Sequence, residues 1–572
     1  MTAPYPENPY AGWLAQVSDP VAWQSWLQPA AQPDTRSLTS KLEELGVTLD
    51  PAVVSQLQQD YVQQFSALWR DMLSAKAPPM ADKRFSTSAW TSNPLFSFNA
   101  AAYLLNAQFL ARLTEAVQSP PKVKRKIRFA VQQMVDAVSP ANFLATNPEA
   151  QQKILETSGE SLSAGVSHLL ADMQKGRISQ TDEAAFEVGE SVANTEGAVI
   201  FENEIFQLIQ YKPQTRTVYE RPLLIVPPCI NKFYIMDLQP DNSLVRYAVE
   251  QGHTIFLISW RNPDDSLGYL TWDDYVEDAV IKAIHVVQEI SGQPQINTLG
   301  FCVGGTLLAS ALAVLFARGE KPVASLSLLT ALLDFSDAGV LEVYIDEMQV
   351  AMREQSIGRG GLMPGRDFTA AFSSLRPNDL VWNYVESSYL KGETPRAFDL
   401  LYWNADSTNV PGPMFCYYLR NLYLENSLRT PRRLTMCGEP VDLGKISAPT
   451  FIYGSREDHI VPWQAAYAST SLLNPKIPNR NRFILGASGH IAGVINPPAK
   501  KKRSYWRNDK PAADAATWLR TAQEHAGSWW PEWSAFLAEY GGVQVAAPRK
   551  YGSTTYKPIE PAPGRYVRVR SD

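Results

Sequence analysis

The sequence predicts an α/β protein in which a mostly helical N-terminal region precedes a larger domain built on a parallel sheet. Beyond about residue 181, apolar runs such as 222–228 and 254–260 alternate with helical patterns such as 272–290. Strands that are apolar along their whole length are typical of a parallel sheet covered by helices on both faces. Residues 296–313 add a second observation, because they follow the order strand, tight turn, helix.

The tight turn carries the pattern Gly-x-Cys-x-Gly, formed by Gly300, Cys302 and Gly304. This spacing matches the nucleophile elbow of the α/β-hydrolase fold, with cysteine where serine usually stands. Small residues on both sides of the nucleophile allow a sharp, strained corner. The N-terminus of the following helix favours a thiolate. A buried structural cysteine beside a glycine-rich turn is the alternative, so the rest of the chain must decide.

Composition narrows the class of protein. The chain has 572 residues with 45% hydrophobic content, which predicts more than one domain. A net charge of −6 gives no electrostatic case for nucleic acid as a partner. The four cysteines are scattered and not at metal-ligand spacing, so we expect no metal, no cofactor and a reducing cytoplasm. We also expect no secretory signal and no transmembrane segment, because no apolar run is long enough.

Changes in the pattern of apolar and polar residues along the chain predict its domains. Residues 1–183 are expected to form a mostly helical N-terminal domain, with an amphipathic stripe at 57–72. Such a stripe packs within the protein or attaches it to a membrane or granule, and both interpretations stay open. Residues 184–572 are expected to form the α/β-hydrolase catalytic domain. The alternation stops over about 335–444, which predicts a cap inserted above the site, and it resumes at 449–454.

An elbow nucleophile needs an acid and a histidine later in the chain, in that order. Asp458 and His490 each come directly after a predicted strand. Loops at the carboxyl ends of parallel strands are where an α/β sheet holds its active site. Glu457 could replace Asp458, and His459 competes as the base, although it shares a loop with the acid. The sequence therefore predicts a Cys302–His490–Asp458 triad.

The residue types in this triad predict acyl transfer. A thiol that attacks a thioester forms another thioester, so the acyl group stays activated on Cys302. His490 would take the thiol proton, and Asp458 would hold the imidazole in the right tautomer. The developing oxyanion needs two backbone N–H donors, and we expect Val303 and Ile230. Ile230 is chosen because the prolines before it in its loop have no N–H.

Long motifs carry a family resemblance over nearly the whole chain. They lie at residues 201–211, 227–234, 259–264, 300–305, 375–384, 458–462 and 486–498, with Phe85, Trp90, Asn93, Pro94 and Phe96 in the N-terminal region. These motifs resemble those of the polyhydroxyalkanoate synthases, the poly(3-hydroxyalkanoate) polymerases. The tracts at 229–232 and 259–264 look most like class I, whose members work as a single type of subunit.

The resemblance implies an acyltransferase that polymerises (R)-3-hydroxyacyl-CoA, with short-chain monomers such as 3-hydroxybutyryl-CoA, and releases CoA. It also implies a cytoplasmic homodimer on the surface of polyester granules, among granule-associated proteins. In the family the aspartate is often assigned to the substrate's 3-hydroxyl, so Asp458 activates that group or orients His490. Arg376 matches a candidate for CoA contact, and Trp403 one that lines the cap.

Two other functions stay open at this point. A cysteine-dependent α/β-hydrolase of the thioesterase or dienelactone hydrolase type would use the same triad and release a free acid. A non-catalytic granule-coat protein would use the amphipathic N-terminal helices and would release no thiol from acyl-CoA.

Overall fold

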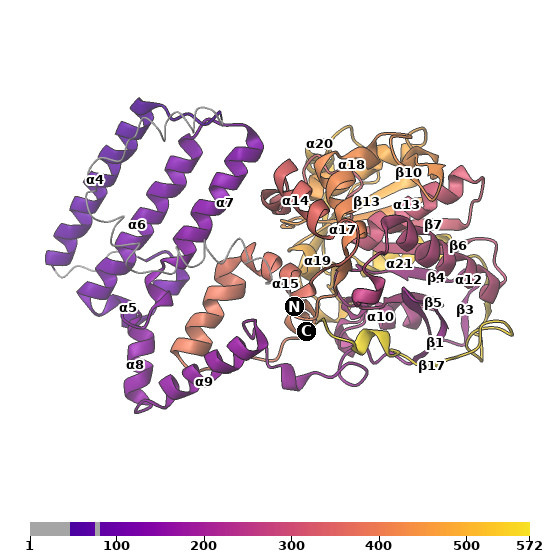
Figure 1. The fold of residues 1–572 in the computed structure, drawn as a ribbon, viewed down its shortest axis with the longest axis horizontal. Helices are drawn as coiled ribbons and strands as arrows, with labels where there is room; N and C mark the ends of the chain where they lie inside the picture. The colour runs from indigo at the N-terminus through magenta and orange to yellow at the C-terminus, as the bar shows by residue number, and fades with distance from the viewer. Residues whose placement is uncertain (1–45, 75–79, 572) are drawn as a thin grey trace, which may run out of the picture. The chain divides into compact units, whose positions relative to one another are not determined.

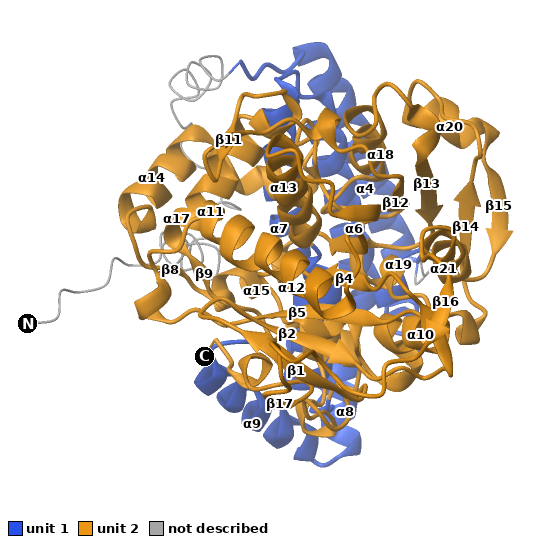
Figure 2. Ribbon diagram, turned by 90° about the vertical axis from the view of Figure 1, so that its right-hand side faces the viewer, with its two compact units in different colours: residues 1–178, 376–394 blue, residues 179–375, 395–572 orange. Residues whose placement is uncertain are grey.

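The structure is a computed structural model that describes residues 46–74 and 80–571. The predicted helical character of residues 1–45 lies outside these ranges. The chain divides into two compact units, coloured separately in Figure 2. Unit 1 holds residues 1–178 and 376–394, and unit 2 holds residues 179–375 and 395–572. The predicted domain limits and cap limits stay predictions, but a segment of the predicted cap is grouped with unit 1.

Unit 1 is helical in the part of it that the structure describes. Its main helices are α4 (Pro51–Leu73), α5 (Ser88–Thr91), α6 (Pro94–Ala116), α7 (Pro121–Ala137), α8 (Pro148–Glu156) and α9 (Glu160–Lys175). Proline begins α4, α6, α7 and α8, where its missing N–H costs no hydrogen bond. The stripe predicted at 57–72 faces α6, with ring centroids of Tyr61 and Phe109 at 5.1 Å and of Trp69 and Phe98 at 5.1 Å.

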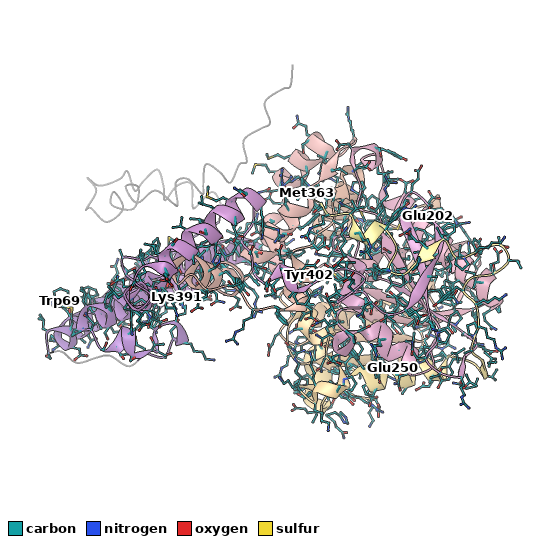
Figure 3. The ribbon with its side chains drawn as sticks, turned by 90° about the horizontal axis from the view of Figure 1, so that it is seen from below. Trp69, Glu202, Glu250, Met363, Lys391 and Tyr402 are labelled. Atoms are coloured by element: carbon teal, nitrogen blue, oxygen red, sulfur yellow. The ribbon has the colours of Figure 1, made fainter. Side chains whose placement is uncertain are left out.

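The segment 376–394 joins unit 1 through specific contacts. It contains the π-helical turns η9 (Asn378–Trp382) and η10 (Val385–Leu390). The Lys391 ammonium lies 2.5 Å from a Glu149 carboxylate oxygen, and Lys391 is labelled among the helices of unit 1 in Figure 3. A Cβ on Gly165 would lie 2.0 Å from the Tyr389 carbonyl oxygen, so only glycine lets α9 approach η10 this closely.

Unit 2 is built on an eleven-stranded sheet in the order β15-β14-β13-β12-β7-β6-β4-β5-β2-β1-β17. The strands are β1 (Gly197–Glu202), β2 (Phe206–Tyr211), β4 (Leu223–Val226), β5 (Ile255–Trp260), β6 (Ile296–Phe301), β7 (Val323–Leu329), β12 (Thr450–Ser455), β13 (Asn481–Gly486), β14 (Ser504–Arg507), β15 (Gln523–Ala526) and β17 (Glu560–Pro561). The six central strands, from β13 to β5, are parallel, and the strands at both edges are antiparallel. Figure 1 shows the central strands with helices packed against them.

Each central strand is buried on both faces, which explains its continuous apolar sequence. In β4, Leu224 and Val226 join one core, while Leu223 and Ile225 join the core on the other face. The first core includes α12 (Lys282–Ser291), α13 (Val303–Ala317), α18 (Trp463–Leu472) and α20 (Ala515–Thr521), and the second includes α10 (Leu244–Glu250) and α21 (Trp530–Glu539). Burying each such aliphatic side chain stabilises the fold by about 1.5–3 kcal/mol.

The chain between β7 and β12 departs from this alternation. Its helices in unit 2 are α14 (Glu347–Ile357), α15 (Gly365–Ser374), α16 (Asp399–Asn404), α17 (Gly412–Tyr417) and the π-helical η11 (Tyr418–Leu424). The only strands there among the described residues are two pairs of two-residue strands. These are β8 (Leu362–Met363) with β9 (Val410–Pro411), and β10 (Thr435–Met436) with β11 (Glu439–Pro440). Across residues 46–74 and 80–571, no helix combines the length and the apolar character needed to cross a bilayer.

Candidate active site

Cys302 occupies a strained corner between β6 and α13. Its backbone has φ 53° and ψ −129°, a conformation that L-residues rarely adopt. Its N–H donates to the Leu329 carbonyl at 3.0 Å, and its own carbonyl accepts from the Gly305 N–H at 2.9 Å. These bonds hold the corner from the neighbouring strand and from the helix. The Cys302 side chain is only partly buried, at the positive end of the α13 dipole.

The glycines around Cys302 are required by close backbone contacts. A Cβ on Gly304 would lie 2.3 Å from the Val226 carbonyl oxygen, at the end of β4. A Cβ on Gly300 would lie 2.4 Å from the Gly305 Cα. Real Cβ atoms do not approach other atoms this closely, so a larger residue would push α13 away from the sheet. The Gly-x-Cys-x-Gly pattern therefore reflects packing at the elbow.

Asp458 and His490 form a buried pair at the ends of two neighbouring parallel strands. Asp458 follows β12, and His490 opens α19 (His490–Val494) after β13. The Asp458 Oδ2 atom lies 2.7 Å from His490 Nδ1. Its other oxygen, Oδ1, accepts hydrogen bonds from the N–H groups of Ile460 at 2.9 Å and Val461 at 2.8 Å. Both carboxylate oxygens are thus occupied, and the imidazole is fixed through Nδ1.

The electrostatics of His490 connect this pair to Cys302. Burial, the largest contribution, lowers the pKa of His490, but the charges of Asp458 and Cys302 and hydrogen bonds to both groups raise it to about 10. Because Nδ1 faces Asp458, Nε2 is the nitrogen left for the sulfur. The ring of Phe301 stacks on the imidazole with centroids at 5.7 Å. A charged imidazole can be held in this setting.

The competing residues have other surroundings. Glu457 is exposed, whereas Asp458 is buried. The His459 carbonyl accepts a hydrogen bond from the Val340 N–H at 2.9 Å, whereas the Asp458 carboxylate is bonded to His490. The remaining histidines pack or pair elsewhere: His168 with Ser388, His253 with Tyr219, His285 with Glu320 and His525 with Tyr505. The geometry therefore groups Asp458 and His490 with Cys302.

The two expected oxyanion donors lie on adjacent elements. Val303 is the first residue of α13, so its N–H has no acceptor within the helix. Ile230 lies in the loop after β4, the strand beside β6. The neighbouring Cys229 thiol is buried, and burial together with the charge of Cys302 raises its pKa to about 12. Cys229 is thus a packed thiol in the same loop.

The two remaining predicted residues are placed differently. Arg376 belongs to unit 1, so the structure does not group it with Cys302; its guanidinium lies 3.6 Å from Asp379 and its side chain is half exposed. Trp403 is buried in α16, and its indole N–H donates to the Lys232 carbonyl at 2.7 Å. Trp403 therefore contacts the loop that carries Ile230.

Two residues near the site escaped the sequence analysis. Phe301 precedes the nucleophile, and its contact with His490 depends on the fold. Tyr423 lies in η11, and burial together with the negative charge of Cys302 raises the pKa of its hydroxyl. Its ring packs on Phe335 with centroids at 4.9 Å. The signal that could have found Tyr423 is the aromatic tract at 415–423 within the predicted cap.

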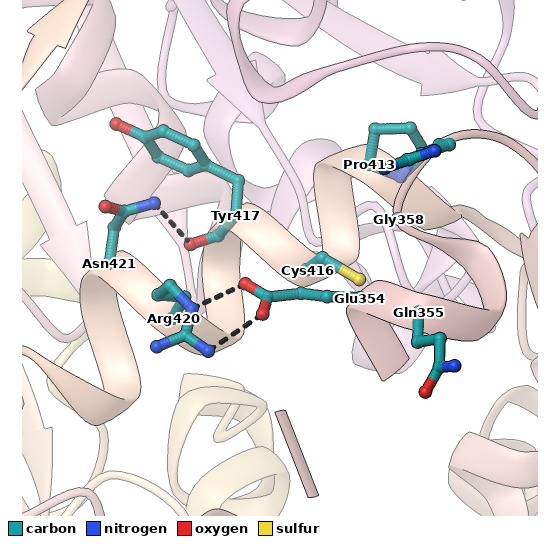
Figure 4. A pocket seen from close by; sticks show the side chains of 9 residues that line it. Glu354, Gln355, Gly358, Pro413, Cys416, Tyr417, Arg420 and Asn421 are labelled. Atoms are coloured by element: carbon teal, nitrogen blue, oxygen red, sulfur yellow. Dashed lines mark hydrogen bonds and ion pairs between the residues drawn. The ribbon is translucent and has the colours of Figure 1, made fainter. Parts of the chain in front are cut away.

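A cavity of about 750 Å³ is lined by residues of α14, α17 and η11, and none of the predicted site residues lines it. Figure 4 shows its lining, in which Arg420 pairs with Glu354 through atoms 2.5 and 2.8 Å apart. Arg359 is a further charged residue of this lining. Over the described part of the chain, no three His, Cys, Asp or Glu side chains are grouped as metal ligands would be.

Comparisons with known proteins agree with the fold described above. Residues 222–497 match the family model described as the alpha/beta hydrolase fold, which confirms the predicted fold class. Residues 81–248 match the family model described as the N-terminus of poly-beta-hydroxybutyrate polymerase (PhaC).

Relatives match over almost the whole chain. It is 57% identical to the poly(3-hydroxyalkanoate) polymerase subunit PhaC of Cupriavidus necator, covering 97% of this chain and 96% of that protein. It is 37% identical to the corresponding subunit of Rhizobium meliloti, covering 98% and 92%. It is 39% identical to the poly(3-hydroxyalkanoate) polymerase of Methylorubrum extorquens, covering 95% and 92%. The chain belongs to the poly(3-hydroxyalkanoate) polymerase family, which confirms the resemblance and the predicted acyltransferase class of enzyme.

Proposed function

We propose that this enzyme polymerises (R)-3-hydroxyacyl-CoA through a thioester on Cys302 and releases CoA. The observation that carries the proposal is the cysteine at a strained elbow beside the buried His490–Asp458 pair. That arrangement occurs in a chain of the poly(3-hydroxyalkanoate) polymerase family. A strained nucleophile next to an oriented base is what covalent acyl transfer requires.

In the acylation step, His490 Nε2 holds the proton that leaves the Cys302 thiol, which makes the imidazole the charged form that its raised pKa favours. The sulfur attacks the thioester carbonyl, and the resulting oxyanion is bound by the N–H groups of Val303 and Ile230. The tetrahedral intermediate then expels CoA as a thiolate, which receives the proton from His490. One thioester forms as another breaks, so the acyl group stays activated.

In the elongation step, the 3-hydroxyl of the next monomer attacks the acyl-Cys302 thioester. His490 takes the hydroxyl proton and returns it to the Cys302 sulfur as the ester bond forms. The lengthened chain, now on the incoming CoA, acylates Cys302 again, and that step releases CoA. The hydrogen bonds at both Asp458 oxygens support its role in orienting His490 over direct activation of the hydroxyl.

The proposed monomer, location, oligomeric state and substrate contacts rest on separate observations. The polymer named in the matching family model is poly-beta-hydroxybutyrate, which supports short-chain monomers such as 3-hydroxybutyryl-CoA and a class I enzyme. A cytoplasmic homodimer on granules with granule-associated proteins, and a CoA contact by Arg376, rest on the family resemblance. Trp403 was expected to line the cap, and its burial in α16 is consistent with a wall beside the site.

Two variants test the proposal. We expect Cys302→Ala to abolish CoA release from 3-hydroxybutyryl-CoA. We expect His490→Ala to fold normally by circular dichroism and to leave Cys302 unacylated in mass spectra. Unchanged CoA release in the first variant, or full acylation in the second, would reject the assigned roles. Turbidity from polymer, measured against free acid, separates a polymerase from a thioesterase.

A further inference from the structure

The loop that carries Ile230 is bound by a segment far along the chain. The Ile230 carbonyl accepts from the Thr408 N–H at 3.0 Å. The next residue, Asn231, forms an antiparallel bridge with Ser407, and its side-chain amide donates to the Ser407 hydroxyl at 3.3 Å. These contacts give the loop a short piece of the ladder that a regular strand would have.

A third contact extends this pairing by one residue. The carbonyl of Lys232 accepts from the Trp403 indole N–H at 2.7 Å. Both side chains are at least nine-tenths buried. A buried carbonyl without a partner is costly, so this indole donor has no easy replacement. Ile230, Asn231 and Lys232 are therefore each hydrogen-bonded to a residue between 403 and 408. We call residues 403–408 the clamp segment.

The other side of the Ile230 N–H is anchored as well. The Pro227 carbonyl accepts from the Trp260 indole N–H at 2.9 Å. The Ile230 N–H proposed for the oxyanion hole thus lies between two hydrogen-bonded carbonyl groups. The Pro227 carbonyl precedes it in the chain, and the Ile230 carbonyl follows it. No helix or strand includes this loop, so its geometry depends on these external bonds.

We propose that the clamp segment positions the Ile230 N–H for the oxyanion, with Trp403 as its principal positioning residue. The inference rests on the proposed function, because this N–H matters only if an oxyanion forms at Cys302. An oxyanion donor acts only when it is aimed at the developing charge, and a displacement of about 1 Å can cost about a hundredfold in rate. The clamp segment lies within the predicted cap, so movement of that insertion would also misplace the donor.

The variant Trp403→Phe removes the indole N–H and keeps most of the buried ring. The matched control is Trp533→Phe, because the Trp533 indole donates to the Ser327 hydroxyl at 3.1 Å, on the sheet and away from the clamp segment. Two rates are measured in each full-length variant. One is single-turnover acylation of Cys302 by 3-hydroxybutyryl-CoA, followed by mass spectrometry. The other is alkylation of Cys302 by iodoacetamide, a displacement at carbon that forms no oxyanion.

We expect Trp403→Phe to slow acylation by about ten- to a hundredfold and to leave alkylation within about twofold of wild type. Trp533→Phe should leave both rates near wild type. Equal acylation in the two variants, or a parallel loss of both rates in Trp403→Phe, would overturn the inference. Wild-type enzyme that is alkylated but never acylated would reject the proposed function itself, and the clamp with it.

A second variant serves if Trp403→Phe fails to fold by circular dichroism. Ser407→Ala removes the acceptor of the Asn231 amide and leaves the backbone bridge in place. We expect the same separation of the two rates, with acylation slower by about three- to tenfold. A variant that folds and keeps wild-type acylation would show that the clamp segment does not position the donor.

Discussion

The variant Asp458→Asn tests how the acid acts, because the surrounding donors determine the orientation of the new amide. Oδ1 of Asp458 accepts from the N–H groups of Ile460 and Val461. Only the amide oxygen can replace it there, since an NH₂ group would face two donors. The NH₂ group must then point at His490 Nδ1 and make that nitrogen an acceptor. The imidazole proton is forced onto Nε2, which can no longer take the proton of Cys302.

The size of the effect follows from the loss of both tautomer and charge. The negative charge and hydrogen bond of Asp458 help to raise the pKa of His490 to about 10, while burial opposes them. In Asp458→Asn the burial remains and the Asp458 contribution is lost. The same replacement in a serine-protease triad lowers the rate by about ten-thousandfold. We therefore expect acylation to slow by about a thousand- to ten-thousandfold, or about 4–5.5 kcal/mol of barrier.

The assay is rapid-quench acylation of Cys302 with 3-hydroxybutyryl-CoA, read by mass spectrometry of the Cys302 peptide. Glu457→Gln is the control, because Glu457 is the exposed neighbour of Asp458 in the same loop. Its acylation rate should stay within about twofold of wild type. If Asp458→Asn is acylated at the wild-type rate and only chain growth stops, Asp458 serves the substrate hydroxyl and our reasoning about the tautomer is wrong.

Three further outcomes can be measured. Gly304→Ala places a Cβ 2.3 Å from the Val226 carbonyl oxygen, so we expect a loss of about 2–4 kcal/mol of stability, and an unchanged melting temperature would contradict the packing argument. Iodoacetamide at pH 8 should label Cys302 and spare Cys229, whose pKa burial raises to about 12; peptide mass spectra showing equal labelling would refute this. The pKa of His490 is raised from 6.5 to about 10. Between pH 6.5 and about 10 the folded protein therefore keeps a proton on this imidazole that the unfolded chain has lost. The free energy of unfolding should fall as pH rises through that window, by up to about 1.4 kcal/mol per pH unit. Calorimetry of His490→Gln should show a flatter dependence, and an identical one would count against the charged imidazole.

The central sheet could be predicted because its strands are buried on both faces. The apolar runs at 222–228 and 254–260 correspond to β4 (Leu223–Val226) and β5 (Ile255–Trp260). The edge strands β14 and β15 escaped prediction, since their side chains are partly exposed and mixed in polarity. No local sequence pattern indicates that residues 376–394 group with unit 1. This grouping depends on contacts such as the Tyr389 hydroxyl donating to Asp172 at 2.8 Å.

For the candidate site, too, some features could be predicted from the sequence and others could not. The order of Cys302, Asp458 and His490, each directly after a strand, is written in the chain and could be predicted from it. The hydrogen bond from Trp403 to Lys232 could not, because it joins α16 to the loop after β4, and only tertiary packing brings these two elements together. The same holds for Tyr423, which an insertion brings near Cys302. Short-range patterns therefore predict which groups react, and long-range packing determines how they are held.

The nucleophile itself favours transfer over cleavage. If serine stood at position 302, the acyl-enzyme would be an oxygen ester of the same kind as the links in the polymer, and passing the chain to another hydroxyl would gain little free energy. In the proposed mechanism the chain is stored as a thioester on Cys302, so each transfer to a hydroxyl is downhill. A reactive thioester must also be protected from water. The Cys302 side chain is only partly exposed, and Tyr423 from the inserted segment lies near it. In the proposed mechanism, sulfur at the elbow and the predicted cap would serve one requirement, because an activated chain is useful only if the next monomer reaches it before water does.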